Sequence, residues 1–371
     1  MTHLGGGTRP EAPVERVSAT AWTVPTDTPE GDGTLLWDAT TIVVAEADAG
    51  GRRGLGYTYA DEACAGLISG RLAPEVTGFD AMDVPGAWRA MVRAIRNLGR
   101  PGLASSAVSA VDTALWDLKA QLLDVSLVAL LGAVRDSVAV YGSGGFTTYP
   151  DERLRDQLAG WAGEGIGMVK MKVGADPAAD RRRVALAREA IGPEVELFVD
   201  ANGAYTRPQA AAQAQAFADA GVSWFEEPVS SDDLAGLRLL RRDLPPGMAV
   251  AAGEYAYDPA GFRRLVDAEA VDVLQADATR CGGITGFLGA AALCEAASLP
   301  LSAHTAPAIH AAVACAARPA VHVEYFHDHA RIEQRLFDGL PELHGGVLAP
   351  DRSRPGLGLE LRRADVEAFA V

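Results

Sequence analysis

The sequence lacks the features typical of membrane, secreted and nucleic-acid-binding proteins. No stretch of its 371 residues approaches the roughly 18 uninterrupted apolar residues that span a bilayer. Residues 1–13 lack the basic and apolar regions of a signal peptide. The formal net charge of −16 disfavours nucleic acid and anionic membranes as partners, because both require a basic surface. We therefore expect a cytoplasmic protein that binds neither.

Cysteine and histidine are also scarce. The four cysteines are scattered and show no Cys-x-x-Cys or zinc-finger spacing, which argues against a disulfide framework and for reduced thiols. The local group of His322, His327 and His329 has no zinc-site spacing. We interpret His327, Asp328 and His329 as a solvated loop, with substrate contact as the alternative.

Lysine is rarer than any other charged residue, since three of the 33 basic residues are lysine and 30 are arginine. Two of the three, Lys170 and Lys172, lie two positions apart. A lysine can lose its proton when it is desolvated or lies beside another cation, whereas an arginine effectively cannot. The pair therefore indicates a chemical role that arginine could not fill. The alternative is that two surface lysines lie together by chance.

The first third of the chain has a mixed pattern. We expect a flexible tail over 1–13 and an α+β capping domain over 14–135. Apolar alternation predicts antiparallel strands, and apolar spacing of three to four predicts helices, with Ser105 or Ser106 as an N-cap. The expected elements are strands over 14–24 and 40–46 and helices over 85–98 and 105–123.

From residue 136 to 345, short apolar strands alternate with amphipathic, alanine-rich helices. Eight such units close more naturally into a (β/α)8 barrel than into an open sheet. The predicted strands are 138–141, 168–173, 196–200, 223–225, 248–252, 271–275, 299–303 and 321–323. Helices expected between them include 181–191, 208–220, 259–268 and 285–297.

Ionisable residues lie at the C-terminal ends of seven consecutive predicted strands. Counted from Lys172, their separations are 20 to 28 positions, about one βα unit each. The C-terminal ends of barrel strands meet at one mouth, where barrel enzymes hold their sites. A single charge after a strand is usually the solvated start of a loop, but seven in succession indicate a site. The residues are Lys170 and Lys172, then Asp200, Glu226, Glu254, Asp277, His304 and Glu324.

Three of these residues, Asp200, Glu226 and Glu254, follow neighbouring strands and suggest a metal site. Three carboxylates cannot share a small volume as anions without a compensating cation, and all-oxygen ligation fits one Mg²⁺ ion per site. Glu227 competes with Glu226, because the sequence does not show which of the two points inward. The alternative is that arginines pair with the three carboxylates.

Groups able to carry protons flank the three carboxylates. Lys170 and Lys172 lie on one side, and Asp277 and His304 lie on the other. The Asp277 carboxylate can hold the His304 imidazole in one tautomer. This arrangement indicates removal of the proton α to a carboxylate, with Mg²⁺, Lys170 and Glu324 stabilising the enediolate. We expect the cations to lower the pKa of Lys172 toward neutrality. A histidine satisfied in the core is the alternative reading of His304.

These residues resemble the mandelate racemase subgroup of the enolase superfamily, in the mandelate racemase/muconate lactonizing enzyme family. The resemblance covers about Val14 to Gly358. It rests on Ala110–Asp117, Lys170–Lys172, Val199–Asn202, Phe225–Pro228, Gly253–Glu254, Asp277–Gly283, His304 and His322–Glu324.

The resemblance implies an α+β capping domain over a modified barrel of the (β/α)7β type, with residues 346–371 returning to the cap. It decides for Glu226 over Glu227 as a ligand. Arg280 stands where mandelate racemase itself has a lysine. The implied roles are Mg²⁺ ligation by Asp200, Glu226 and Glu254, proton transfer by Lys172 and the Asp277–His304 dyad, contacts to the substrate carboxylate by Lys170 and Glu324, and substrate binding by Asn202 and Ser143.

Family members that have both a Lys-x-Lys motif and an Asp–His dyad are mainly racemases or acid-sugar dehydratases. In mandelate racemase the lid is apolar, whereas the equivalent stretch here, Pro25–Thr34, is polar and glycine-rich. A polar lid suits a polyol, so we favour dehydration of an aldonate or aldarate to a 2-keto-3-deoxy acid. The alternatives are a racemase or epimerase of a 2-hydroxy acid, a sugar-lactone cycloisomerase and a non-enzymatic binding relic. We expect a small carboxylate as substrate and a homo-oligomeric protein.

Overall fold

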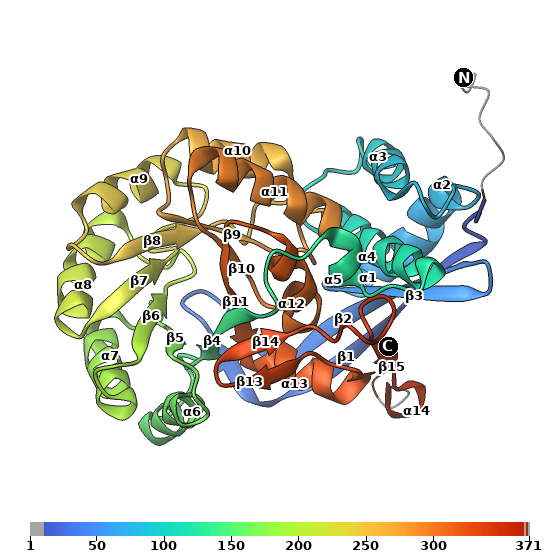
Figure 1. Cartoon of the computed structure of the whole chain (residues 1–371). Coiled ribbons are helices and arrows are strands. Elements are labelled where there is room, and N and C mark those ends of the chain that lie inside the picture. The colour runs from blue at the N-terminus through green and yellow to red at the C-terminus, as the bar shows by residue number, and fades with distance from the viewer. Residues whose placement is uncertain (1–10, 367–368, 370–371) are drawn as a thin grey trace.

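The computed structural model describes residues 11–366 and 369 of the chain. Its larger part is a closed barrel of eight parallel strands with helices around it (Figure 1). Strands pair in chain order, and β11 pairs with β4 to close the ring. All eight predicted strands are confirmed. They are β4 (Val138–Gly144), β5 (Met168–Lys172), β6 (Glu196–Asp200), β7 (Val222–Glu226), β8 (Ala249–Ala252), β9 (Val273–Ala276), β10 (Leu301–Ala303) and β11 (Ala320–Phe326).

Three of the barrel helices, α7, α8 and α10, begin with a side-chain N-cap and a proline in the first turn. The Asp176 and Asp258 side chains accept hydrogen bonds from first-turn N–H groups, and each is followed by a proline, which has no N–H to satisfy. Thr206 forms a capping box with Gln209. The helices are α6 (Asp151–Gly163), α7 (Pro177–Ile191), α8 (Arg207–Asp219), α9 (Leu234–Asp243), α10 (Pro259–Asp267), α11 (Gly283–Ala297), α12 (Pro307–Ala316) and α13 (His327–Leu336).

Large aromatic side chains fill the barrel interior. The rings of Phe198 and Trp224 stack with their centroids 5.1 Å apart, and Tyr141 lies edge-on to Phe198. Phe198 precedes Asp200 by two positions, and Trp224 precedes Glu226 by two. Because successive side chains on a strand alternate between faces, these rings share the inward face of the carboxylates and lie one layer deeper. They form a rigid floor for the mouth.

A three-stranded antiparallel sheet and several helices form the cap beside the barrel (Figure 1). The expected strands and helices of this part are present, but its third strand, β3, was not predicted because Gly54 and Gly56 weaken the strand pattern. Both glycines pack against α4. The cap contains β1 (Arg16–Gly31), β2 (Leu36–Ala49), β3 (Arg52–Tyr59), α1 (Ala63–Leu67), the π-helix η1 (Ile68–Leu72), α2 (Ala73–Val76), α3 (Val84–Ala94) and α4 (Leu103–Leu123).

The start of α4 differs from the prediction. The helix begins at Leu103 with Gly102 as its N-cap, so the expectation of an N-cap at Ser105 or Ser106 is wrong. The Ser105 hydroxyl instead donates a hydrogen bond to the carbonyl oxygen of Tyr257 in the barrel, 2.7 Å away. The serine is used for the contact between cap and barrel rather than for capping.

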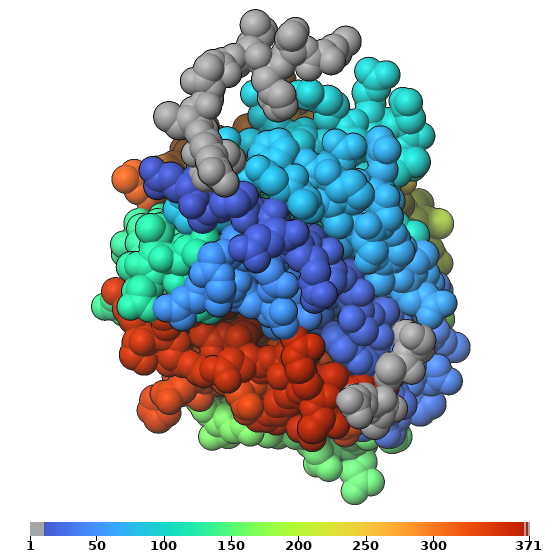
Figure 2. All heavy atoms as spheres, turned by 90° about the vertical axis from the view of Figure 1, so that its right-hand side faces the viewer, coloured from blue at the N-terminus to red at the C-terminus, as the bar shows by residue number. Residues whose placement is uncertain are grey.

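The C-terminal part of the chain lies against the cap, as the adjacent red and blue surfaces in Figure 2 show. The N–H of Leu357 donates to Oδ1 of Asp117 on α4, and the N–H of Leu55 in β3 donates to Oδ2 of the same carboxylate. The remaining elements are α5 (Leu127–Leu131), β12 (Phe337–Asp338), β13 (Glu342–His344), β14 (Val347–Ala349), β15 (Glu360–Leu361) and α14 (Arg363–Val366).

Most of the tail predicted over 1–13 lies outside the described residues. At its end, the Ala12 carbonyl accepts a hydrogen bond from Ala81, and Pro13 forms a bridge with Asp80. Among residues 11–366 and 369, no helix combines the length and the apolar character needed to cross a membrane. The cytoplasmic location and the homo-oligomeric state stay predictions.

Replacing Gly56 by alanine tests the contact between β3 and α4. A Cβ at this position would lie 2.3 Å from the Ala110 carbonyl oxygen and 2.5 Å from the Ala114 nitrogen, and helix backbone cannot yield easily. We expect Gly56→Ala to destabilise the protein by about 1–3 kcal/mol or more, measured by chemical denaturation. Gly70→Ala is the matched control, because nothing lies within 4 Å of its added Cβ. Equal stability of the two variants would contradict the predicted close packing.

A second prediction concerns Glu333 of α13, which joins barrel and cap. The Tyr57 hydroxyl and the Ala308 N–H both donate to its carboxyl. Burial nevertheless raises the pKa of Glu333 to about 8. Because the folded pKa exceeds the unfolded value of about 4.3, the stabilisation is complete at acidic pH and is lost between about pH 4.3 and 8.

Within that window, we expect Glu333→Gln to reduce the fall of unfolding free energy with rising pH, by up to about 1.4 kcal/mol per pH unit. Urea denaturation at several pH values measures the slope. An unchanged slope would show that Glu333 does not titrate in this range.

Candidate active site

Strand register brings the predicted site residues to one level of the barrel mouth. Lys172 pairs in register with Asp200 on the next strand, and Asp200 pairs with Glu226 on the one after it. Glu254 follows β8 directly after Gly253, which has a φ of +138° and whose added Cβ would lie 2.2 Å from the Gln275 carbonyl oxygen. Glycine therefore lets the chain turn closely over β9 and present Glu254 to the same mouth.

Asp200, Glu226 and Glu254 converge as the sequence predicted. All three are buried, and each offers one carboxylate oxygen that lies within 4.8 Å of those of the other two. Burial and the charge of Asp200 raise the pKa of Glu226 to about 8, although Lys170 opposes the shift. The cluster therefore has too little positive charge to keep all its carboxylates ionised, and a divalent cation bound by hard oxygen ligands would supply it.

Glu227, the competitor of Glu226, is also buried beside this cluster. Its Oε1 has no hydrogen-bond partner, and its backbone has a φ of +36°. Burial and the neighbouring carboxylates, Glu254 first, raise its pKa well above the usual range. The cluster of three mutually close ligand oxygens contains Glu226 and not Glu227.

The two lysines pair with these carboxylates. Lys170 Nζ lies 2.6 Å from Glu226 and 2.8 Å from Glu324, and Lys172 Nζ lies 2.5 Å from Asp200. Burial and Lys170 would lower the pKa of Lys172, but the carboxylates of Asp200, Glu254 and Glu324 act together and raise it. The expected lowering of the pKa included the charge of a bound metal ion and stays a prediction for that state. Without the ion the pKa is raised, because Asp200 approaches the amine more closely than the sequence could show.

Ser143 and Asn202, predicted near the substrate, lie in the same network. The Ser143 hydroxyl donates to Oε1 of Glu324 over 2.6 Å, and Asn202 Oδ1 accepts from Lys172 over 3.1 Å. Burial would raise the pKa of Glu324, but Lys170, His304 and Lys172 together lower it to about 2. The lowered pKa favours the anionic form of Glu324. Glu324 must be protonated to donate the expected hydrogen bond to a substrate carboxylate, and the charge of Lys170 disfavours that protonation.

His304 and Asp277 form the predicted dyad on the other side of the cluster. His304 Nδ1 lies 2.8 Å from Asp277 Oδ2, which directs Nε2 toward Glu254 Oε2 at 3.0 Å. The Thr279 hydroxyl and N–H both donate to the other Asp277 oxygen and fix the carboxylate. Burial would lower the pKa of His304, but Glu254, Glu324 and the hydrogen bond that His304 donates to Asp277 raise it to about 10. These carboxylates therefore favour the charged form of the imidazole.

A cavity of about 420 Å³ opens onto Lys172, Asn202, Glu254, His304 and Glu324. Its size is within the range of pockets that enclose small organic ligands. The barrel side of the cavity, which we term the barrel wall, is lined by Lys172, Asn202, Glu254, Tyr255, Arg280, His304, Thr305, Glu324, Phe326 and His329. The cap wall is lined by Asp32, Leu35, Trp37, Ala39, Thr40, Thr41, Tyr59, Ala60 and Asp61.

The lid hairpin, residues 25–41, is fixed to the barrel. A Cβ on Gly33 would lie 2.4 Å from the Ala201 carbonyl oxygen and 2.7 Å from that of Val173, so the tip of the lid lies directly on the barrel backbone. The Thr147 N–H and hydroxyl donate to the carbonyls of Gly31 and Asp32. The polar stretch that the sequence identified as the lid is therefore in contact with the mouth.

His327, Asp328 and His329 do not form the expected solvated loop, because they begin helix α13. His329 is buried, lines the cavity and stacks on Tyr59 with ring centroids 3.4 Å apart. His327 pairs with Asp27 of the lid hairpin. The helix start was missed because residues 327–336 contain too few apolar side chains to show a helical pattern.

Some residues of the site were not predicted. Trp224 Nε1 donates to Glu226 Oε2, and the Thr305 N–H donates to Glu324 Oε2. The Trp224 contact could have been inferred, because residues two apart on a strand share a face. Neither the Thr305 contact nor the contribution of Tyr59 from the cap gives a signal in the sequence.

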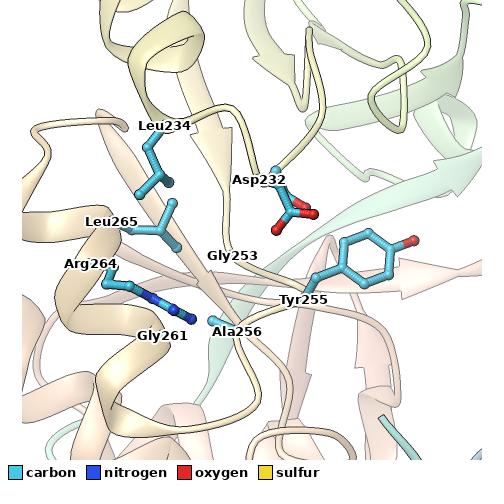
Figure 3. A pocket seen from close by; sticks show the side chains of 9 residues that line it. Asp232, Leu234, Gly253, Tyr255, Ala256, Gly261, Arg264 and Leu265 are labelled. Carbon is cyan, nitrogen blue, oxygen red and sulfur yellow. The ribbon is translucent and has the colours of Figure 1, made fainter. Parts of the chain in front are cut away.

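A smaller pocket adjoins the cavity on the barrel rim (Figure 3). Tyr255 contributes to the walls of both, and the pocket is also lined by Asp232 and Arg264. Tyr255 thus stands between two hollows, one containing the site residues and one at the loops that follow β7 and β8.

Comparison with known families agrees with this geometry. Residues 33–132 match the mandelate racemase/muconate lactonizing enzyme N-terminal domain, and residues 153–366 match the enolase C-terminal domain-like family. The chain belongs to the mandelate racemase/muconate lactonizing enzyme family of the enolase superfamily.

Relatives within this family are similar over nearly the whole chain. A 3,6-anhydro-α-L-galactonate cycloisomerase of Streptomyces coelicolor is 33% identical, covering 94% of this chain and 98% of the relative. A mandelate racemase/muconate lactonizing enzyme-like structure from Rubrobacter xylanophilus is 55% identical with a TM-score of 0.95, over 97% and 100% of the two chains. An L-talarate dehydratase from Polaromonas sp. JS666, complexed with Mg and L-glucarate, is 34% identical with a TM-score of 0.87, over 97% and 98%.

The carboxylate cluster of this family member predicts a metal-dependent rise in stability. At about 100 times its dissociation constant, a bound Mg²⁺ ion should stabilise the fold by about 2.7 kcal/mol, seen as a higher melting temperature in calorimetry. Asp200→Asn should remove most of this response. Glu196→Gln, at the opposite end of the same strand, is the control and should retain it. A full response in Asp200→Asn would place the ion elsewhere.

Proposed function

We propose that this protein is a Mg²⁺-dependent enzyme that removes the proton α to the carboxylate of a sugar acid and expels the β-hydroxyl. The product is a 2-keto-3-deoxy acid. The observation that carries the proposal is the placement of two proton carriers at the two ends of one carboxylate cluster. Lys172 contacts Asp200, and His304 contacts Glu254.

Asp200, Glu226 and Glu254 would hold the metal ion, since they are buried, acidic and mutually close. Bound there, Mg²⁺ supplies positive charge for the developing negative charge on the substrate carboxylate, and it offsets the carboxylates that keep Lys172 protonated. The remaining chemistry belongs to side chains of this chain.

Lys172 accepts the α-proton in its neutral form. Lys170, buried with its ammonium group between Glu226 and Glu324, stabilises the negative charge that the loss of this proton leaves on the substrate carboxylate. His304 then donates its Nε2 proton to the β-hydroxyl, which leaves as water as the C–O bond breaks. The enol that remains becomes the keto acid by gaining a proton at C3.

Asp277 and the cap support this assignment. Asp277 accepts from His304 Nδ1 and keeps the imidazole charged and oriented, which is the state that an acid requires. The hydroxyls of Thr40, Thr41 and Tyr59 line the cap wall and suit a polyol. The dehydratase relative complexed with L-glucarate supports a sugar acid as substrate.

A second candidate is the cycloisomerisation of a sugar lactone. The same proton abstraction can expel a ring oxygen in place of a hydroxyl, and the cycloisomerase relative supports it. Racemisation of a 2-hydroxy acid is the third, since Lys172 and His304 could exchange protons on opposite faces of one carbon.

Incubation of aldonic and aldaric acids with Mg²⁺ in D₂O tests the proposal. We expect keto acid, detected with semicarbazide, and deuterium at C3 in the product by NMR. Lys172→Ala and His304→Asn should each lower kcat by about 10²–10⁴-fold. Lys119→Ala, which changes the lysine outside the site, is the control and should have little effect.

The outcomes separate the candidates. Deuterium at C2 of unconsumed substrate without keto acid would overturn dehydration in favour of racemisation. Ring opening of a lactone without loss of water would favour the cycloisomerase. Keto acid formation by His304→Asn at the wild-type rate would contradict the assignment of His304 as the acid.

A further inference from the structure

The two walls of the central cavity differ in charge. The barrel wall carries both signs of charge, with Lys172, Arg280 and His304 beside the carboxylates of Glu254 and Glu324. Lys172 Nζ lies 2.5 Å from Asp200, and Arg280 Nη1 lies 3.4 Å from Glu254. Among the described residues of the cap wall, the charged side chains are Asp32 and Asp61, and both are acidic. The end of a substrate that faces the cap therefore meets negative charge.

The charge of Asp32 is held in place. Its Oδ1 accepts hydrogen bonds from the N–H groups of Thr34 and Leu35, at 2.6 and 2.7 Å. The next residue, Gly33, lies directly on the barrel backbone. Because the turn and the lid tip are both anchored, this carboxylate cannot swing away from an incoming anion without breaking these contacts.

Neither acidic group is neutralised within the described part of the chain. Asp61 Oδ1 accepts from the N–H of Ala63 at the start of α1, and no arginine, lysine or histidine lies within ion-pair distance of Asp61 or Asp32 there. Arg264 instead lines the adjoining pocket, as does Asp232 (Figure 3).

Two of the three hydroxyls that line the cap wall, those of Thr40 and Tyr59, donate their protons to groups of the protein. The Thr40 hydroxyl donates its proton to Asp328 Oδ2, and the Tyr59 hydroxyl donates to the His329 carbonyl oxygen over 3.4 Å. These two hydroxyl oxygens can therefore offer a ligand only their lone pairs. A substrate hydroxyl can donate to a lone pair, whereas a carboxylate has no proton to donate.

We propose that the substrate carries one carboxylate, at the barrel wall, and ends in a neutral hydroxyl-bearing carbon at the cap wall. The substrate class is then the aldonates rather than the aldarates. The inference rests on the proposed function for which end of the substrate reacts. The chemistry of the cap wall alone determines what the opposite end of the substrate carries.

The test compares two acids of identical configuration from C2 to C5, one ending in a hydroxymethyl group and one in a carboxylate. We expect the Mg²⁺-loaded protein to bind the aldonate at least tenfold more tightly in isothermal titration calorimetry, and to turn it over with at least tenfold higher kcat/KM. Because part of the preference is electrostatic, added salt should reduce it.

Asp32→Asn and Asp61→Asn should reduce the preference by improving the affinity for the aldarate, with little change for the aldonate. Asparagine keeps the oxygen that accepts the turn hydrogen bonds, so the lid conformation is retained. Asp38→Asn is the matched control, because Asp38 lies on the same hairpin but does not line the cavity. It should leave the ratio unchanged.

Equal or tighter binding of the aldarate, or an unchanged ratio in both aspartate variants, would overturn the inference. Tighter binding of the aldonate without turnover of either acid would support the inference and overturn the proposed dehydration. The calorimetric and kinetic readouts thus distinguish the two failures.

Discussion

The buried ammonium group of Lys170 is the interaction on which the site depends. Its Nζ lies within 3.5 Å of Asp200, Glu226 and Glu324, and the side chain is almost fully removed from solvent. Burial of so many carboxylates near one another would be prohibitive without a cation among them, and burial of the ammonium would be equally costly without the carboxylates. The closed barrel, with its strands in register, holds the ammonium group and the carboxylates beside one another, and each charge offsets the cost of burying the others.

This dependence explains why much of the site could be predicted from the sequence. The positions of Lys172, Asp200, Glu226 and His304 recur at the length of one βα unit, and a closed parallel barrel converts such a repeat into spatial proximity. Protonation states are different, because they depend on ångström distances. The pKa of Lys172 is raised by a contact with Asp200 that no spacing reveals.

The cap was less predictable for a related reason. Its third strand contains glycines because α4 packs against the backbone, and Ser105 near the start of α4 contacts the barrel instead of capping the helix. These features follow from tertiary packing, which overrides local propensity. The division of the cavity has the same origin, because the barrel makes one wall and the cap, a separate part of the chain, makes the other.

The scarcity of lysine gives the molecule an unusual selectivity toward chemical labelling. Of its three lysine side chains, Lys170 is sealed in the barrel and Lys119 is half-buried with its amine bonded to the Met82 carbonyl. Lys172 is the one that lines the cavity. Among the lysines, an amine-directed reagent small enough to enter would therefore label the one in this cavity, and its reaction rate would report on the charge state of that amine.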